Sequence, residues 1–178
     1  MSIFDHFSAE DREILQARAQ RAAREAQIAH RQDFLTALVV SVGQETYALP
    51  VEAVANVYED IAVTPVPCVP PVVAGVANIR GHITLALDLA ALLGVANDSK
   101  PEAITLVVLA DRDLGVAFQV DSMRGVESLV ASDLASVPAN MALKHPAYVR
   151  GILPDGTVLL NISSMLENPD LIAASGQP

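Results

Sequence analysis

The sequence has few aromatic residues and no tryptophan, with only four phenylalanines and three tyrosines among its 178 residues. Hydrophobic residues nevertheless make up 52% of the chain. A core must therefore be built mainly from Val, Leu, Ile and Ala, and β-branched residues favour strands. The length suits one domain, or two small subdomains that share a core.

Cysteine and positive charge are also scarce. Cys68 is the only cysteine, which excludes an internal disulfide and fits a reducing cytoplasm. Lys and Arg together number 11 against 21 Asp and Glu, which gives a formal net charge of −10. Nucleic-acid binding depends on clustered cations, so we expect no nucleic-acid partner.

The pattern of charge and hydrophobicity along the sequence indicates neither a targeting segment nor a membrane segment. The N-terminus has no basic region followed by an apolar run, so we predict no signal peptide. The most apolar stretch, residues 63–79, contains four prolines that exclude a membrane helix there. We therefore expect a cytoplasmic protein that does not insert into the membrane.

Motifs for metals, cofactors and nucleophilic catalysis are absent. The four histidines lack the spacing of a zinc site; they are His6, His30, His82 and His145. The chain has no Gly-x-Ser-x-Gly elbow and no glycine-rich phosphate or dinucleotide loop. Cys68 lies between prolines with no positive neighbour to lower its pKa, so we interpret it as an inert thiol. We expect no metal and no cofactor.

One carboxylate pair offers an enzymatic alternative. Asp88 and Asp121 each follow an apolar run, and two such carboxylates could share a proton and activate water in a small hydrolase. An aspartic protease needs a small hydroxyl residue and then Gly after each Asp, but residues 89–90 are Leu-Ala and residues 122–123 are Ser-Met. We interpret Asp88 as a helix cap and Asp121 as a group that binds backbone amides, and we expect no enzyme activity.

Residues 75–94 are the most informative stretch. Apolar runs at 76–79 and 83–87 flank Arg80-Gly81, which predicts a β-hairpin, because Gly permits the positive φ of a tight turn. Asp88 can cap the short helix that follows, and Gly94 can end it. The leucines at positions 89, 92 and 93 fall on one face of that helix.

A second stretch repeats this order. Gly151-Ile152, a turn at 154–156 and an apolar strand lead to Asn161, which caps a helix carrying Ile162, Met165 and Leu166. A repeat of hairpin, cap and short helix predicts two related small barrels that share an apolar seam. Chance similarity in a chain rich in Val and Leu is the alternative.

The run Gly75-Val76-x-Asn78-Ile79-Arg80-Gly81, followed by an apolar strand and Asp88-Leu89, resembles the CheW family of bacterial chemotaxis coupling proteins. The resemblance extends from about Phe34 to about Glu167. It implies a mainly β fold: two SH3-like five-stranded β-barrels packed together with short helices. It also implies a non-catalytic scaffold.

The resemblance implies partners as well. One barrel would bind a CheA-type histidine kinase, and the groove between barrels would bind the cytoplasmic tip of methyl-accepting chemoreceptors, which recruits the protein to membrane-associated arrays. The implied partner-binding residues are Val54, Asn56, Gly75, Asn78, Arg80 and Gly81. Asn56 stands where the family often has a Glu that faces the Arg, which puts the usual partner surface in question. A coupling domain for a twitching or developmental pathway is the alternative.

These observations divide the chain into three parts. Residues 1–33 form a predicted helical extension with a narrow seam of small residues; the seam comprises Leu15, Ala19, Ala22 and Ala26. This extension is either solvated or a site of self-association. Residues 34–167 form the CheW-like domain, with a first barrel region at about 34–95 and a second at about 100–167, and residues 168–178 form a tail.

Overall fold

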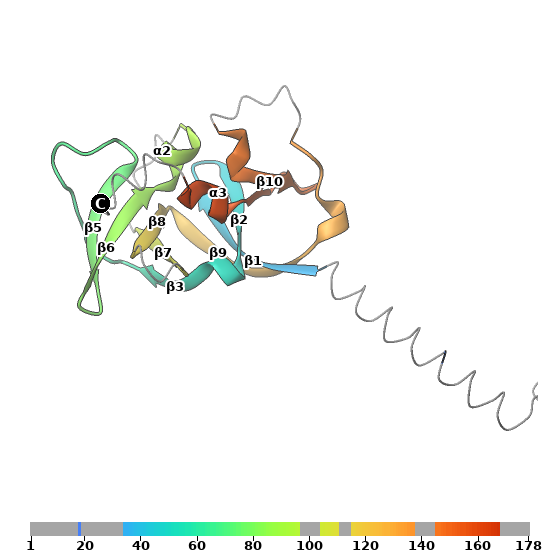
Figure 1. The fold of residues 1–178 in the computed structure, drawn as a ribbon, viewed down its shortest axis with the longest axis horizontal. Helices are drawn as coiled ribbons and strands as arrows, with labels where there is room; N and C mark the ends of the chain where they lie inside the picture. Colours follow the sequence, from blue (N-terminus) through green and yellow to red (C-terminus); the bar gives the residue numbers. More distant parts are fainter. Residues whose placement is uncertain (1–17, 19–33, 97–103, 111–114, 138–144, 168–178) are drawn as a thin grey trace, which may run out of the picture.

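The computed structural model describes residues 18, 34–96, 104–110, 115–137 and 145–167, which form a mainly β structure with short helices (Figure 1). The predicted helical extension, apart from Arg18, and the predicted tail lie outside the described residues. Both stay predictions.

The described strands form two sheets. The first, sheet A, has five strands in the order β10-β11-β2-β1-β9; their bounds are Val149–Ile152, Val158–Leu160, Glu45–Pro50, Phe34–Val42 and Ser122–Val130. The second, sheet B, has six strands in the order β3-β7-β8-β6-β5-β4; their bounds are Val54–Glu59, Thr105–Leu109, Val116–Val120, His82–Asp88, Val73–Ile79 and Val63–Thr64. The helical elements are η2 (Val51–Ala53), α2 (Leu89–Leu93), η3 (Ala131–Asp133), η4 (Pro146–Tyr148) and α3 (Ile162–Leu166).

The prediction of two closed five-stranded barrels is wrong, because neither sheet closes among the described residues. In sheet B the edge strand β4 has only two residues, and prolines follow it at positions 65, 67, 70 and 71. Proline has no backbone N–H to donate, so the strand cannot extend and pair with β3. The sheet still curls, since Tyr58 of β3 and Val63 of β4 pack against one small apolar cluster.

The sheets also do not follow the two barrel regions expected along the chain. The hairpin β1–β2 comes from the first region but lies in sheet A with β9, β10 and β11. The hairpin β7–β8 comes from the second region but lies in sheet B with β3 to β6. Parallel pairs join each hairpin to its new sheet, Tyr47 with Val158 and Leu85 with Val116. The two halves thus exchange their first hairpins.

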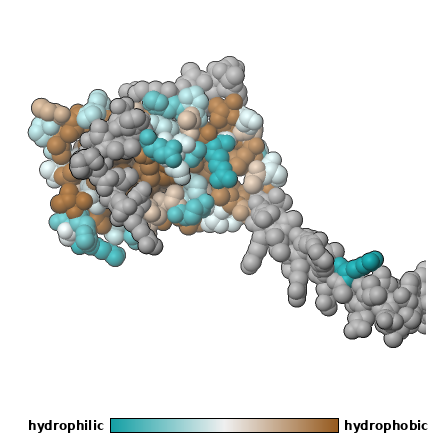
Figure 2. Space-filling model, viewed as in Figure 1, coloured by the Kyte–Doolittle hydropathy of each residue, from teal (hydrophilic) through white to brown (hydrophobic). Residues whose placement is uncertain are grey.

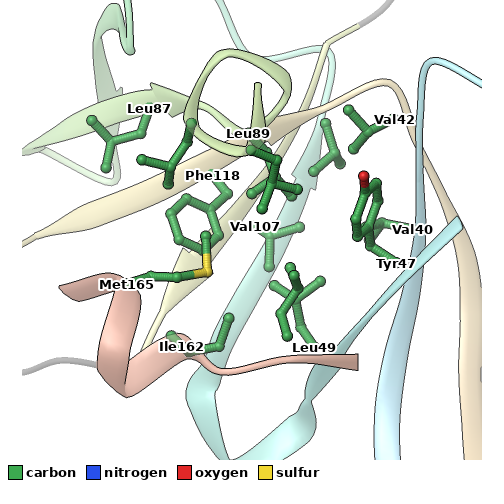
Figure 3. Close-up of a cluster of buried hydrophobic side chains, with 14 of the residues drawn as sticks. Val40, Val42, Tyr47, Leu49, Leu87, Leu89, Val107, Phe118, Ile162 and Met165 are labelled. Atoms are coloured by element: carbon green, nitrogen blue, oxygen red, sulfur yellow. The ribbon is translucent and has the colours of Figure 1, made fainter. Parts of the chain in front are cut away.

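The main core fills the layer between the two sheets. One row crosses sheet B through paired residues; it comprises Val57, Val107, Phe118, Leu87 and Val73. Figure 3 shows side chains of both sheets, of α2 and of α3 pointing into this layer. Phe118, Leu49 and Leu89 are among its largest fully buried side chains. Two smaller clusters add apolar contacts, one formed around Leu106 and one around Leu159.

The repeat of hairpin, cap and short helix is present in the structure. The hairpin β5–β6 leads to α2, whose N-cap Asp88 accepts a hydrogen bond from the Ala91 amide at 3.0 Å. The hairpin β10–β11 leads to α3, whose N-cap Asn161 accepts one from the Ser164 amide at 3.3 Å. Each side chain satisfies an amide that the first helical turn leaves without a partner.

Candidate functional site

The turn between β5 and β6 projects from one end of the molecule (Figure 1). Ile79 pairs with His82, so Arg80 and Gly81 form a two-residue loop. Their φ angles are 53° and 89°, and a type I′ turn requires positive values at both positions. The Asn78 side-chain oxygen accepts a hydrogen bond from the Gly81 amide at 2.9 Å. Asn78 and Gly81 therefore hold Arg80 at the tip.

Arg80 is exposed, and no acid among the described residues neutralises its charge. Its guanidinium carbon lies 5.8 Å from the centre of the Tyr58 ring on β3. Within the described part of the chain, the guanidinium contacts this ring and forms no ion pair with a carboxylate. An aromatic face attracts a cation without consuming its hydrogen-bond donors. The N–H donors of the Arg80 guanidinium are therefore available to a partner.

The structure divides the other predicted site residues between this turn and strand β3. Asn56 is exposed on β3 and pairs with Val108. Asn56 and Tyr58 are two positions apart on β3, so both side chains point to the same face of the strand. Val54, at the start of β3, is half-buried and packs against the main core. The Tyr58 ring connects this strand to the Arg80 turn.

Gly75 differs from the other site residues, because it is buried within β5. A Cβ atom at this position would lie 2.2 Å from the carbonyl oxygen of Thr64. This separation is far below any real contact of a Cβ atom. The absence of a side chain thus lets β4 approach β5.

Two residues of this surface were not predicted. Tyr58 could have been found by its spacing from Asn56, but its contact with Arg80 depends on how the sheet curls. Ile83 lies opposite Asn78 and is 69% exposed. Figure 2 shows a hydrophilic tip where this hairpin projects, with apolar surface beside it. An exposed apolar side chain on the same hairpin as an exposed cation is typical of protein-binding surfaces.

A second apolar surface lies where the layer between the sheets reaches the open edge of sheet A. Val126 of β9 continues the buried row of Leu49 and Leu38, yet it is 61% exposed. Met123 likewise pairs with Val40, and it is 40% exposed. The inner face of sheet A is therefore incompletely covered along β9.

An open pocket of about 260 Å³ lies between η2, the end of β7 and α3. Its lining is mainly apolar, with Glu52 and Ser163 as its polar members; the others are Ala53, Leu109, Ala110, Ile162 and Leu166. The pocket lies where the end of β7, in sheet B, meets η2 and α3. We call this pocket and the exposed Met123 and Val126 of β9 the groove surfaces.

Comparison with known proteins places the chain in a family. The family model of the CheW-like domain matches residues 36–169, three quarters of the chain. The chain belongs to the CheW family.

The relatives of this CheW-family protein are chemotaxis proteins. The chemotaxis protein CheW of Bacillus subtilis is 28% identical over 125 residues, 70% of this chain and 80% of the relative. That of Thermotoga maritima is 29% identical over 134 residues, 73% of this chain and 86% of the relative. The family and these relatives make the chain a chemotaxis scaffold protein, as the sequence predicted.

A solved structure of the family confirms the fold. The crystal structure of the scaffolding protein TtCheW from Thermoanaerobacter tengcongensis superposes with a TM-score of 0.66 at 22% sequence identity. The match covers 76% of this chain and 94% of that one. The open sheets and exchanged hairpins thus belong to a CheW-like fold.

Both aspartates of the hydrolase alternative bind backbone amides in this CheW-like domain. Asp88 caps α2, as described above, and an Asp121 side-chain oxygen accepts a hydrogen bond from the Gly43 amide at 2.6 Å. Asp121 thereby joins the β1–β2 turn to the end of β8. Among the described residues, no three His, Cys, Asp or Glu side chains are grouped to hold a metal ion. None of the helices in the described ranges is long and apolar enough to cross a membrane.

Tyr47 of β2 and Asp155 of the turn between β10 and β11 have pKa values shifted by their surroundings. Burial raises the pKa of Tyr47, and the hydrogen bond that its hydroxyl donates to Glu45 raises it further. The backbone amide of Thr157 lowers the pKa of Asp155, and the Thr157 hydroxyl adds to this effect. Both groups have structural causes for their shifts, and neither belongs to the Arg80 turn.

We predict that the role of Asp88 is capping and does not require its charge. Asp88→Ala should lower the free energy of unfolding by about 1 kcal/mol, because an amide of α2 loses its acceptor. Asp88→Asn should change stability by less than about 0.5 kcal/mol, since Asn is an equally good N-cap. Urea unfolding of the three proteins checks this. A loss for Asn as large as that for Ala would show that the charge matters instead.

Proposed function

We propose that this CheW-family protein is a non-catalytic adaptor that couples methyl-accepting chemoreceptors to a CheA-type histidine kinase. The observation that carries the proposal is the free guanidinium of Arg80 on a fixed turn. Arginine offers a planar fork of donors that suits a carboxylate on a partner. The exposed Ile83, opposite Asn78 on the same hairpin, adds apolar contact area.

The kinase would bind at the β5–β6 hairpin. Asn78 and Gly81 fix the turn, so little conformational entropy would be lost when a partner binds Arg80. The exposed Asn56, on the same face of β3 as Tyr58, extends this proposed surface, and the half-buried Val54 anchors the start of the strand on the main core. A site on rigid strands positions its side chains better than a site on a loop.

The receptor tip would bind at the groove surfaces. The cytoplasmic tip of a chemoreceptor is a helical hairpin, and an amphipathic helix binds by placing its apolar face in a hydrophobic groove. The incompletely covered Met123 and Val126 and the pocket lined by Ala53, Leu109 and Leu166 supply such apolar surface. Weak contacts of this kind can build an array through avidity.

Several observations support a positional mechanism without catalysis. The carboxylates of Asp88 and Asp121 each accept a hydrogen bond from a backbone amide, which gives both groups a structural role. The protein would act in the cytoplasm, recruited to membrane-associated receptor arrays. Holding kinase and receptor together would let the ligand state of the receptor change kinase activity.

The experiment is to measure binding of Arg80→Ala to the kinase and to a receptor fragment by calorimetry. Truncation of a hot-spot arginine costs about 2 kcal/mol or more, roughly a thirtyfold loss of affinity. We expect at least a tenfold loss for one partner, with a thermal midpoint within a few degrees of the wild type.

Arg150→Ala is the matched control, because Arg150 is an exposed arginine on β10 of the repeated hairpin. It should bind both partners like the wild type. If Arg80→Ala also kept its affinity for both partners, Arg80 would be an ordinary solvated turn residue and the proposed kinase surface would be wrong.

A further inference from the structure

We infer that Tyr58 is a positioning residue that holds the Arg80 guanidinium for a carboxylate on the partner surface. The inference rests on the proposed function, because it concerns how Arg80 recognises the kinase. It also goes further, since it assigns a role to a residue outside the recognised motif. It names the chemistry that the partner must supply, an Asp or Glu side chain.

In the part of the chain that the structure describes, an aromatic ring lies beside the Arg80 cation and no carboxylate forms an ion pair with it. The guanidinium carbon of Arg80 lies 5.8 Å from the Tyr58 ring centre, within the range of a cation–π contact. The Tyr58 ring is half-buried and packs against the apolar cluster that includes Ile79. Ile79 precedes Arg80 directly. The ring is therefore fixed by the same cluster that anchors the turn.

The charge balance indicates the kind of partner. A carboxylate at position 56 would lie on the same face of β3 as Tyr58 and could neutralise Arg80 within the molecule. This chain has Asn56 there, so the strand offers a neutral amide and a ring. The guanidinium carbon lies over the Tyr58 ring, and this contact does not consume the N–H donors of the guanidinium. A partner carboxylate can then accept two parallel hydrogen bonds from that edge.

The arrangement makes Tyr58 a determinant of specificity. An arginine that forms an ion pair within its own chain must break that pair before it can bind a partner. An arginine held against an aromatic ring is already oriented, and no neighbouring acid neutralises its charge. A partner surface that offers only neutral acceptors would gain less from such an arginine. We therefore expect the affinity for the kinase to fall as salt rises, through Arg80.

The test measures kinase affinity by calorimetry for Tyr58→Phe, Tyr58→Leu, Arg80→Ala and the double variant Tyr58→Leu/Arg80→Ala. Loss of an exposed cation–π contact corresponds to about a two- to fivefold change. Tyr58→Leu should weaken binding about threefold, and Tyr58→Phe should bind like the wild type because it keeps the ring. The double variant should bind no more weakly than Arg80→Ala alone, since Tyr58 acts through Arg80.

Further measurements separate the outcomes. Tyr58→Val, with a β-branched residue suited to an edge strand, gives a second variant without a ring if the Leu variant folds poorly. The salt dependence of binding should be steeper for the wild type than for Arg80→Ala. Equal salt dependence would show that the partner group is neutral and would overturn the carboxylate assignment.

The inference on Tyr58 and the proposed function fail in different ways. If Arg80→Ala weakens binding but neither Tyr58→Leu nor Tyr58→Val does, Tyr58 has no positioning role and the kinase surface stands. Equal losses in Tyr58→Phe and Tyr58→Leu would also overturn the role of the ring. If Arg80→Ala binds like the wild type, the kinase surface itself is wrong, and the inference falls with it.

Discussion

Gly75→Ala should lower the free energy of unfolding by about 3 kcal/mol or more and the thermal midpoint by roughly 10 °C. Two costs add at this position. The φ angle of Gly75 is +152°, where residues with a side chain are strained. The new Cβ would also meet the Thr64 carbonyl oxygen at 2.2 Å, and this oxygen belongs to backbone that cannot move aside alone. Thermal unfolding followed by circular dichroism checks the prediction.

Gly125→Ala is the matched control, because Gly125 has nearly the same φ angle, +148°, and a Cβ added there would have nothing within 4 Å. Gly125→Ala should lower the free energy of unfolding by about 1 kcal/mol, because it adds the backbone strain without the clash. The difference between the two variants then measures the approach of β4 to β5. If both variants lost the same stability, the strand β4 would not be held against Gly75.

The repeated hairpin gives an independent reason to assign a packing role to this glycine. Gly151 occupies the matching position in β10, and a Cβ there would lie 3.1 Å from the carbonyl oxygen of Ala135. Each hairpin has an irregularity in its register at this glycine, between Val73 and Gly75 and between Val149 and Gly151. The sequence motif places Gly75 among the partner-binding residues, but Gly75 is buried. Its place in the motif is therefore also explained by strand packing.

Local features of the fold could be predicted from the sequence. The Arg80-Gly81 turn, the caps Asp88 and Asn161, and the order of hairpin and short helix each depend on residues a few positions apart. Each of these features depends on the steric freedom of one residue or on one local hydrogen bond, so it can be recognised from a single sequence. The same short-range signals predicted the repeat.

Closure and strand exchange could not be predicted in this way. The parallel pairs of Tyr47 with Val158 and of Leu85 with Val116 join segments that are far apart in the chain. Apolar runs in β2 and β11 are equally compatible with pairing inside each half, because alternation fixes the face of a strand and not its neighbour. The prediction of closed barrels failed for this reason.

The candidate site was predictable only in part. The motif contains Asn78, Arg80 and Gly81, and their arrangement follows from the turn. Tyr58 lies outside the motif, and its contact with Arg80 arises because sheet B curls until its edge strand β3 approaches the hairpin tip. Sequence reasoning left the fork of Arg80 without a partner in the chain, and the structure provides an aromatic face for it.

Leu159→Asp should abolish the cooperative unfolding transition of the domain. Leu159 has no exposed surface, and it pairs with Ala48 of β2 and Gly151 of β10 at the centre of a cluster that also includes Leu129. A buried charge without a partner costs several kcal/mol, about 3–5 kcal/mol when one member of a buried pair is removed. Typical domains are stable by about 5–15 kcal/mol, so the variant should be largely unfolded or insoluble.

Two further variants separate the charge from the lost packing. Leu159→Ala should cost about 2–5 kcal/mol through a cavity, and it should still unfold cooperatively. Ile83→Asp places the same charge on a strand position that is 69% exposed, where the change should stay within about 0.5 kcal/mol. The order of stability is then Ile83→Asp, Leu159→Ala, Leu159→Asp. A Leu159→Asp protein with a thermal midpoint near the wild-type value would mean that this side chain reaches water, and the buried position of β11 in sheet A would have to be abandoned.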